Sequence, residues 1–101
     1  MELLERLRAC TGFQWDDGNA EKNWIRHRVS RSEAEEIFLN QPLVVADDDA
    51  HAVTEERFYA LGQTNRGRLL FLVFTIRRRL VRVISVRDMT KREREVYRSH
   101  E

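Results

Sequence analysis

The stretch that decides the fold of this chain is Leu69-Leu-Phe-Leu-Val-Phe-Thr75, an almost unbroken run of apolar, strand-forming residues. Such a run predicts a central strand that is buried on both faces of a sheet. Residues 80–86 are its predicted hairpin partner. The three arginines at 77–79 include no Gly or Asn, the residues that accept positive φ in a two-residue turn, so we expect a longer and looser loop there.

Shorter patterns predict the remaining strands. Residues 13–15 alternate, residues 43–46 form a short apolar run, and residues 57–61 precede a turn. Because consecutive strands have short connections, we expect an antiparallel sheet of four to five strands with helices packed mainly on one face, which is an α+β fold. The 101 residues suffice for a single domain.

Helix signals lie on both sides of these strands. Ser30 with Glu33 and Thr90 with Glu93 have the spacing of a capping box, in which each side chain bonds the other residue's backbone N–H at a helix start. An aspartate at 16 or 17 can cap an earlier helix. Leucines at 3, 4 and 7 have helical spacing and predict one or two turns that dock on the domain or fray. The predicted helices cover residues 2–9, 16–27, 30–39 and 90–98.

Charge is distributed unevenly along the chain, although the formal net charge is only +1. Residues 1–56 hold 6 Lys or Arg and 13 Asp or Glu, a net charge of −7, whereas residues 57–101 hold 12 Lys or Arg and 4 Asp or Glu, a net charge of +8. In the second half, 11 of the cations are Arg, whose planar guanidinium suits phosphate oxygens. The asymmetry indicates a polyanionic partner, or else charge complementarity within the fold.

The cations are concentrated between positions 82 and 97, where a strand runs into a short helix. Cations beside a hydroxyl and a phenol suit a phosphate-rich partner, but a solvated basic face has the same pattern. Arg94 and Tyr97 can share one helix face. If that helix packs across the strand end, both converge with Arg87. The candidates for anion binding are Arg57, Arg82, Arg87 and Arg94.

Two residues are candidates for proton transfer. His27 shares a predicted helix face with Ala20 and Trp24, and it is either a general base or a residue that caps or lines the helix end. Glu93 is either a second proton-transfer group or only the glutamate of its capping box. The residue types alone leave both alternatives open.

Other site types find little support. Asp47-Asp48-Asp49 with His51 lacks the spacing of a calcium loop, and a zinc site would need more His or Cys, so we expect an acidic surface loop and neither metal nor cofactor. Cys10 is the only cysteine, which excludes an intrachain disulfide. The charged N-terminus is unlike a signal peptide and no stretch spans a membrane, so we expect a cytoplasmic protein without a membrane partner.

Several blocks occur in order along the chain and carry a resemblance to a known family. They are Phe13-x-Trp15-Asp16 with Asn23 and His27-x-Val29, then Arg57-Phe-x-Ala-Leu-Gly62, then Gly67-Arg-Leu-Leu70 with Thr75, and finally Arg82-x-Ile-Ser-x-Arg87-x-x-Thr90-x-x-Glu93-Arg94-x-x-Tyr97. Together they resemble the BrnT-type toxins of type II toxin–antitoxin systems over about residues 13–98. The chain departs from the family pattern at Asn19, where Lys is usual, at Arg28, where Gly follows the His, at Arg31, where an aromatic is common, and at Arg78-Arg79, where a Gly-Asp type turn is expected.

The resemblance implies a RelE-like fold over residues 13–101, preceded by an N-terminal extension of residues 1–12. It implies a metal-independent endoribonuclease that cleaves RNA and inhibits translation. It also implies a BrnA-type antitoxin as the partner, with DNA contacted only through that antitoxin. The alternative is a non-catalytic binding module whose basic face mainly binds the antitoxin and serves in operon autorepression.

A ribonuclease of this kind needs charge stabilisation at the phosphate and proton transfer at two oxygens. We predict that Arg87 and Arg94 stabilise the charge with support from Arg57, and that His27 or Glu93 handles a proton. Trp15 and Tyr97 are expected to stack on a base or orient the phosphate. The residues predicted to bind RNA are Trp15, Arg82, Lys91, Arg92 and Tyr97.

Overall fold

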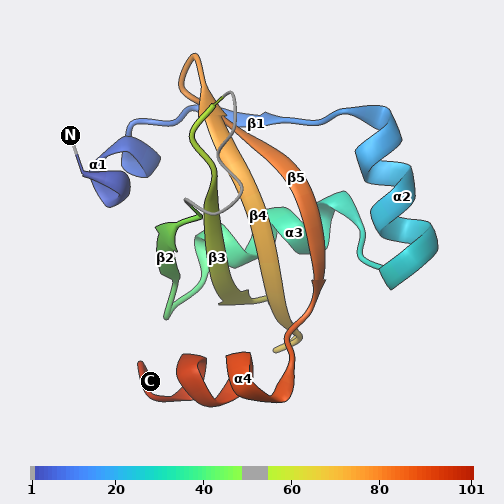
Figure 1. Ribbon diagram of the computed structural model, residues 1–101, viewed down its shortest axis with the longest axis vertical. Helices are drawn as coiled ribbons and strands as arrows, with labels where there is room; N and C mark the ends of the chain where they lie inside the picture. The colour runs from blue at the N-terminus through green and yellow to red at the C-terminus, as the bar shows by residue number, and fades with distance from the viewer. Residues whose placement is uncertain (1, 49–54) are drawn as a thin grey trace.

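The computed structural model describes residues 2–48 and 55–101, which form a five-stranded sheet with helices around it (Figure 1). The N-terminal half supplies most of the helices, and the C-terminal half supplies the three long strands. In chain order the elements are α1 (Leu3–Arg8), β1 (Gly12–Gln14), α2 (Asp17–His27), α3 (Arg31–Glu36), the 3-10 helix η1 (Ile37–Leu39), β2 (Val44–Asp47), β3 (Phe58–Gln63), β4 (Leu69–Arg77), β5 (Leu80–Asp88) and α4 (Lys91–Arg98).

The sheet has the strand order β1-β5-β4-β3-β2. β2, β3, β4 and β5 pair antiparallel, as the short connections predict, but β1 pairs parallel to β5. The expectation of an entirely antiparallel sheet was therefore wrong. Parallel pairing needs a long crossover, and here the chain between β1 and β5 passes through α2, α3, η1, β2, β3 and β4. The three-residue segment gives no sequence signal for its direction.

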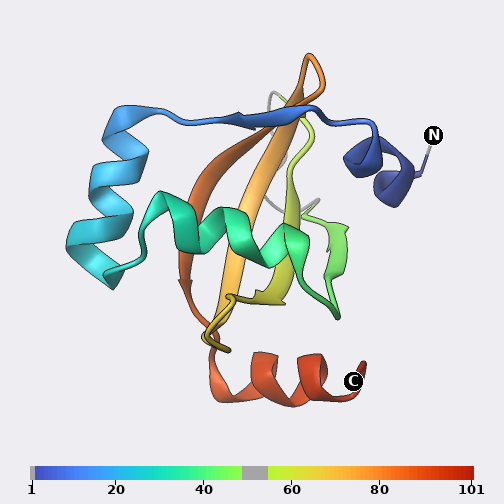
Figure 2. The ribbon, with the colours of Figure 1, turned by 180° about the vertical axis from the view of Figure 1, so that it is seen from behind.

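One face of the sheet is closed by α3, which crosses in front of the strands in Figure 2, while α2 lies along the outer side of β5. The core lies between α3 and this face. It contains Ala34, Ile37, Phe58, Leu72 and Phe74, each buried. Burial along β4 alternates, because its other face is only half-buried. The prediction that this strand is buried on both faces was therefore wrong, and its open side carries the candidate site.

α2 also closes the edge of β5 that the short β1 leaves unpaired. Asn23 is only 4% exposed, and its side-chain oxygen accepts a hydrogen bond from the backbone N–H of Val86 at 3.3 Å. The inward face of α2 therefore contains Asn23, whereas Trp24 is 48% exposed. Trp24 and His27, which share a helix face, are therefore exposed, and that face is not the one packed on the sheet. A side-chain amide here replaces a strand as the partner of the β5 backbone.

α1 docks on the domain. Leu3 and Leu7 pack against the main core, and the Arg6 guanidinium lies over the Phe58 ring at 5.2 Å. The backbone N–H of Thr11 donates to the Arg79 carbonyl at 2.8 Å, which ties the segment after α1 to the β4–β5 turn. These contacts favour docking over fraying for the N-terminal residues.

Three non-glycine residues in the described part of the chain have a positive φ: Arg78 and Arg79 between β4 and β5, and Arg28 after α2. Arg77 pairs with Leu80, so β4 and β5 are joined by a two-residue turn, and the expected looser loop was wrong. Its central residues have φ of 49° at Arg78 and 65° at Arg79, the region that such turns require and that Asn or Gly occupies most easily. Arg28, which follows α2, is likewise left-handed, with φ of 52°.

Replacing Arg78 with Asn should stabilise the protein by about 0.5–1 kcal/mol, because Asn tolerates the left-handed conformation better than Arg. Thermal unfolding measures the effect, and an increase in Tm of a few degrees is expected. Arg66→Asn is the control, because Arg66 is an exposed turn arginine without a positive φ. Equal effects of the two substitutions would contradict the explanation.

Candidate functional site

Among the described residues, no helix covers the face of the sheet that is turned toward the viewer in Figure 1. This open face carries three rows of side chains. The rows follow from the register of β3, β4 and β5, with a bulge between Val73 and Phe74. Arg57 joins the third row by continuing the β3–β4 register one residue beyond Phe58. From α4 upward the rows are Leu61 with Phe71 and Arg87, then Tyr59 with Val73 and Ser85, then Arg57 with Thr75 and Arg82.

This open face combines a partly apolar floor with cations. Tyr59 and Phe71 stack with their ring centroids 5.8 Å apart, and both are half-buried. The predicted cations Arg57, Arg82 and Arg87 lie on the same face, all three half-buried. The sheet therefore brings together cations that are up to 30 residues apart in the chain, an arrangement that suits an anionic ligand with aromatic parts.

Arg87 is held rigidly at the lower end of this face. Its Nη1 and Nη2 donate to the two carboxylate oxygens of Glu93 at 2.8 and 3.0 Å, and its guanidinium lies 4.2 Å from the Phe71 ring centroid. Glu93 also completes the predicted capping box with Thr90. Because a bidentate pair fixes the plane of the guanidinium, the capping box of α4 positions Arg87 on the sheet.

The same contacts set the protonation state of Glu93. The hydrogen bond from Arg87 lowers the pKa of this carboxyl, burial opposes that shift, and the Thr90 backbone N–H lowers it further. Glu93 is therefore ionised at neutral pH. A carboxylate with a lowered pKa is a weak proton acceptor, so its geometry fits orientation of Arg87 better than general-base catalysis.

Tyr97 does not belong to the open face. Its side chain is 0% exposed, and its hydroxyl donates to the Pro42 carbonyl oxygen at 2.7 Å. Burial raises the pKa of the Tyr97 phenol, which keeps the hydroxyl a donor. The prediction that Tyr97 stacks on a base conflicts with this burial: the ring instead packs with Leu61 and Met89 and holds α4 against the sheet.

Tyr97→Phe should lower the free energy of unfolding by about 1–2 kcal/mol, because it leaves the Pro42 carbonyl without its donor. RNA binding should be unchanged, since the phenol does not reach the open face. Chemical denaturation and RNA titration of the same protein separate the two effects. A stable variant with weakened RNA binding would restore Tyr97 to the binding surface.

Arg94 and Trp15 are both engaged elsewhere. Arg94 folds back so that its Nη1 donates to the Met89 carbonyl at 3.0 Å. Trp15 lies on the α3 side of the sheet, where its indole N–H donates to Glu35 at 2.8 Å and Arg31 lies over its ring. The predicted convergence of Arg87, Arg94 and Tyr97 therefore does not form, and Trp15 is separated from the cationic face.

The first turn of α4 and the start of β5 complete the cationic surface. Lys91 and Arg92 are exposed at the lower end of the open face. Arg82, at the upper end, lies 3.8 Å from the Asp16 carboxylate, a long contact that leaves its guanidinium donors available. These three predicted RNA-binding residues thus border the open face at its two ends.

His27 is exposed at the C-terminus of α2, and Arg68 fixes its backbone. Arg68 Nη2 donates to the His27 carbonyl at 2.9 Å and Nη1 donates to the Arg28 carbonyl at 2.8 Å. The same guanidinium binds Asp88 through two donors and Glu33 through one. His27 also acts electrostatically on Asp88, where it lowers the pKa of that carboxyl after the stronger effect of Arg68. His27 therefore lies at the outer edge of β5.

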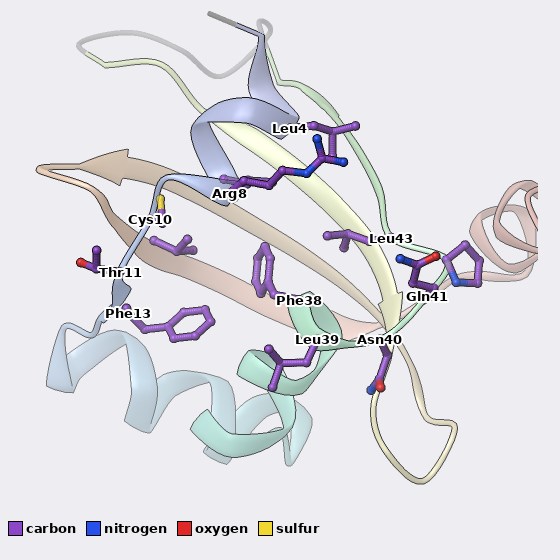
Figure 3. Close-up of a pocket in the computed structure, with 14 residues that line it drawn as sticks. Leu4, Arg8, Cys10, Thr11, Phe13, Phe38, Leu39, Asn40, Gln41 and Leu43 are labelled. Carbon is purple, nitrogen blue, oxygen red and sulfur yellow. The ribbon is translucent and has the colours of Figure 1, made fainter.

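Among the cavities that the described residues line, two lie on opposite sides of the sheet. The larger, ≈ 630 Å³, is bounded by the N-terminal segment, β1, η1 and the approach to β2, and Phe13, Phe38 and Leu43 line it with Arg8 (Figure 3). It is away from the cationic face. The smaller, ≈ 290 Å³, lies between α4 and the open face. Only the smaller cavity adjoins Arg87, so the candidate site includes it.

Metal ligation and membrane insertion find no structural counterpart in the described part of the chain. Across residues 2–48 and 55–101 no three His, Cys, Asp or Glu side chains gather as metal ligands. None of the helices in these two segments is long and apolar enough to cross a membrane. Asp49 and His51 of the suggested acidic loop lie outside the described residues.

A known protein family matches most of this chain. The family model described as "Ribonuclease toxin, BrnT, of type II toxin-antitoxin system" matches residues 15–93. The chain belongs to the BrnT toxin family. The 1.1 Å crystal structure of the Brucella abortus ribonuclease toxin BrnT has a similar fold, with a TM-score of 0.59 and 20% sequence identity over 80% of this chain and 99% of that chain. A search of curated protein sequences returned no match.

The BrnT match places most of the open face inside the family domain. It spans Arg57, Arg82 and Arg87 and ends at Glu93, whereas α1 lies outside it. The family assignment and the α+β architecture confirm the resemblance seen in the sequence blocks. The label RelE-like stays a prediction.

Sequence reasoning missed three residues that shape this BrnT site. Tyr59 and Phe71 form the aromatic floor, and Arg68 fixes the end of α2. The alternation of Arg57, Tyr59 and Leu61 was a usable signal for the aromatic floor, because it places Tyr59 on the same face as Arg57. The prediction that β4 is buried on both faces hid that signal. Arg68 stands in the block Gly67-Arg-Leu-Leu70, but no local pattern reveals its contacts, because its five donors reach residues 20 to 41 positions away.

Proposed function

We propose that this BrnT-family protein is an endoribonuclease toxin that cleaves RNA on the open face of its sheet. The observation that supports this most strongly is the position of Arg87, fixed by Glu93 and placed over Phe71 beside other cations. A rigid guanidinium costs no reorganisation when charge develops on a phosphate, and this favours catalysis. A BrnA-type antitoxin that covers this face would block RNA cleavage, and it would thereby also prevent growth arrest.

The proposed reaction uses the 2′-hydroxyl of the RNA. Its oxygen forms a bond to phosphorus while the bond from phosphorus to the leaving 5′-oxygen breaks, which gives a 2′,3′-cyclic phosphate. The proton of the 2′-hydroxyl passes to a base and the 5′-oxygen receives a proton. Arg87 stabilises the negative charge on the phosphoryl oxygens, with Arg57 and Arg82 holding the neighbouring strand. His27 is the proposed proton-transfer group, because Glu93 is already engaged by Arg87.

Cleavage by the purified protein tests this reaction. End-labelled RNA should be cut in the presence of a metal chelator, and the products should end in a 2′,3′-cyclic phosphate and a 5′-hydroxyl. A 2′-O-methyl group at the cleaved nucleotide should abolish the cut, because the nucleophile is blocked. Products with 3′-hydroxyl ends, or cleavage that depends on added divalent metal, would contradict the mechanism.

The second candidate is a binding module that does not cleave RNA. The observation in its favour is that the Arg87 guanidinium and the Glu93 carboxylate are hydrogen-bonded to each other. A surface that only binds a partner protein also needs its charged groups to be paired in this way. Induction of the chain in bacteria distinguishes the two. Growth arrest with RNA decay, relieved by a co-expressed antitoxin, supports the ribonuclease, whereas tight co-purification with the antitoxin and no arrest supports the module.

A further inference from the structure

The smaller cavity has the size and lining of a site for one flat ring. It measures ≈ 290 Å³ and lies between α4 and the lower part of the open face. That volume is at the lower limit of ligand pockets, which suits a single ring system. Its lining residues are Tyr59, Leu61, Phe71, Thr90, Arg92, Glu93 and Val96.

The wall on the sheet side is aromatic. The rings of Tyr59 and Phe71 stack on each other with their planes inclined by 23°, and the Arg87 guanidinium lies 4.2 Å from the Phe71 centroid. Phe71 is therefore packed between Tyr59 and Arg87, and Tyr59 is the ring on which a base can stack. Aromatic side chains of this kind hold unstacked bases of single-stranded nucleic acid. On the opposite side, Val96 is 45% exposed, which leaves an apolar side chain at the cavity mouth.

The rim of the cavity is cationic. Arg92 lines it from α4, and Arg87 adjoins it through its contacts with Phe71 and Glu93. A base in the cavity would therefore have guanidinium groups beside the phosphates that flank it. Arg82 lies about 15 Å further along β5, where it can contact the strand as it continues across the sheet. The aromatic wall and these cations match the two components of a nucleotide.

We propose that this cavity is a subsite for one unstacked nucleobase of single-stranded RNA, with its ring against Tyr59 beside Phe71 and its flanking phosphates on Arg87 and Arg92. The proposal rests on the proposed function, in that the open face binds RNA. It goes further by naming the base contact. It also replaces the predicted stacking residues Trp15 and Tyr97, which the fold places elsewhere.

Binding of strands that cannot be cleaved tests the subsite without requiring catalysis. The probes are a 2′-O-methyl oligoadenylate and an abasic strand of the same length and charge. Tyr59→Leu should weaken binding of the oligoadenylate about tenfold and leave binding of the abasic strand unchanged. Tyr59→Phe keeps the ring and should bind both strands as the unmodified protein does. Trp24→Leu, which removes an exposed aromatic of α2, is the matched control.

Two outcomes would overturn the subsite. One is an equal loss of affinity for both strands in folded Tyr59→Leu, and the other is no loss for either. If Tyr59→Leu does not fold, photo-crosslinking of 4-thiouridine in a 2′-O-methyl strand to the unmodified protein decides the matter. Adducts at Tyr59 or Phe71 support the subsite, and adducts confined to other segments refute it. Absence of RNA cleavage would count against the ribonuclease alone, because these measurements record binding.

Discussion

Arg87→Ala should lower the rate of RNA cleavage by about 10²–10³-fold, the usual loss when one positioned donor to a developing negative charge is removed. The structure makes Arg87 the best-positioned cation of the open face. It is oriented by two hydrogen bonds to Glu93 and by the Phe71 ring. Growth arrest on induction should be relieved in parallel, because Arg57 and Arg82, the other arginines of the open face, lack such a bidentate partner among the described residues.

The controls must separate loss of catalysis from loss of fold. Arg77→Ala removes another arginine of the same sheet, one paired with Glu55 at 2.8 Å, and should cleave RNA normally. Arg87→Lys keeps the positive charge but cannot form the bidentate pair, so it should recover only a small part of the rate. Each variant is accepted only if its thermal unfolding is cooperative. Undiminished cleavage by a folded Arg87→Ala protein would remove Arg87 from the mechanism.

Arg68→Ala should have the largest effect on stability, a loss of about 2–4 kcal/mol. Each of the five N–H groups of Arg68 has an acceptor within 2.8–3.1 Å. The side chain is 28% exposed, so solvent reduces the worth of each bond. A domain of this size is stable by roughly 5–15 kcal/mol, so the loss should lower Tm by on the order of 10–25 °C.

The pH dependence of this loss identifies its cause. The hydrogen bonds of Arg68 lower the pKa of Asp88 despite partial burial. Burial raises the pKa of Glu33, but its bonds to Ser30 and Arg68 outweigh that effect and lower it. A lowered folded-state pKa stabilises the protein above the unfolded value of about 4 and is lost as pH falls through the folded value. Unmodified protein should therefore lose more stability than Arg68→Ala between about pH 5 and pH 2.

Arg66→Ala is the control for Arg68, because Arg66 is exposed in the same β3–β4 turn. Chemical denaturation at several pH values measures both proteins. A loss of stability that is the same for Arg66→Ala and Arg68→Ala would contradict the assigned contacts. A parallel pH dependence of Arg68→Ala and unmodified protein would show that the two carboxylates do not depend on Arg68.

α2 and α4 show how much of the site follows from sequence. The capping residue Asp16 and the box of Thr90 with Glu93 begin these helices where the sequence predicts. Each of these capping interactions joins residues three positions apart, so the local sequence is enough to determine where the helix begins. The strands at β3, β4 and β5 likewise agree with their apolar runs to within a few residues. The ordered sequence blocks also indicated the BrnT family that the comparison confirmed.

The arrangement of side chains around Arg87 could not be predicted in the same way. Glu93 is explained locally by its capping box, yet only packing of α4 on the sheet brings it to Arg87. Tyr97 has helical spacing from Arg94, but its ring is buried and its hydroxyl bonds to Pro42, 55 positions away. Whether an aromatic residue on α4 lines the core or the ligand surface depends on the rotation of that helix, which spacing alone does not define.

The sequence by itself determined the helix starts, the strands of the antiparallel core, the charge asymmetry and the family, because each depends on neighbouring residues or on composition. Tertiary structure alone decided that β1 runs parallel to β5, that Arg78 and Arg79 form a tight turn, and that one face of β4 stays open. These features depend on register and packing between distant segments. The open face, with Tyr59 and Phe71 beside Arg87, is the product of that long-range pairing.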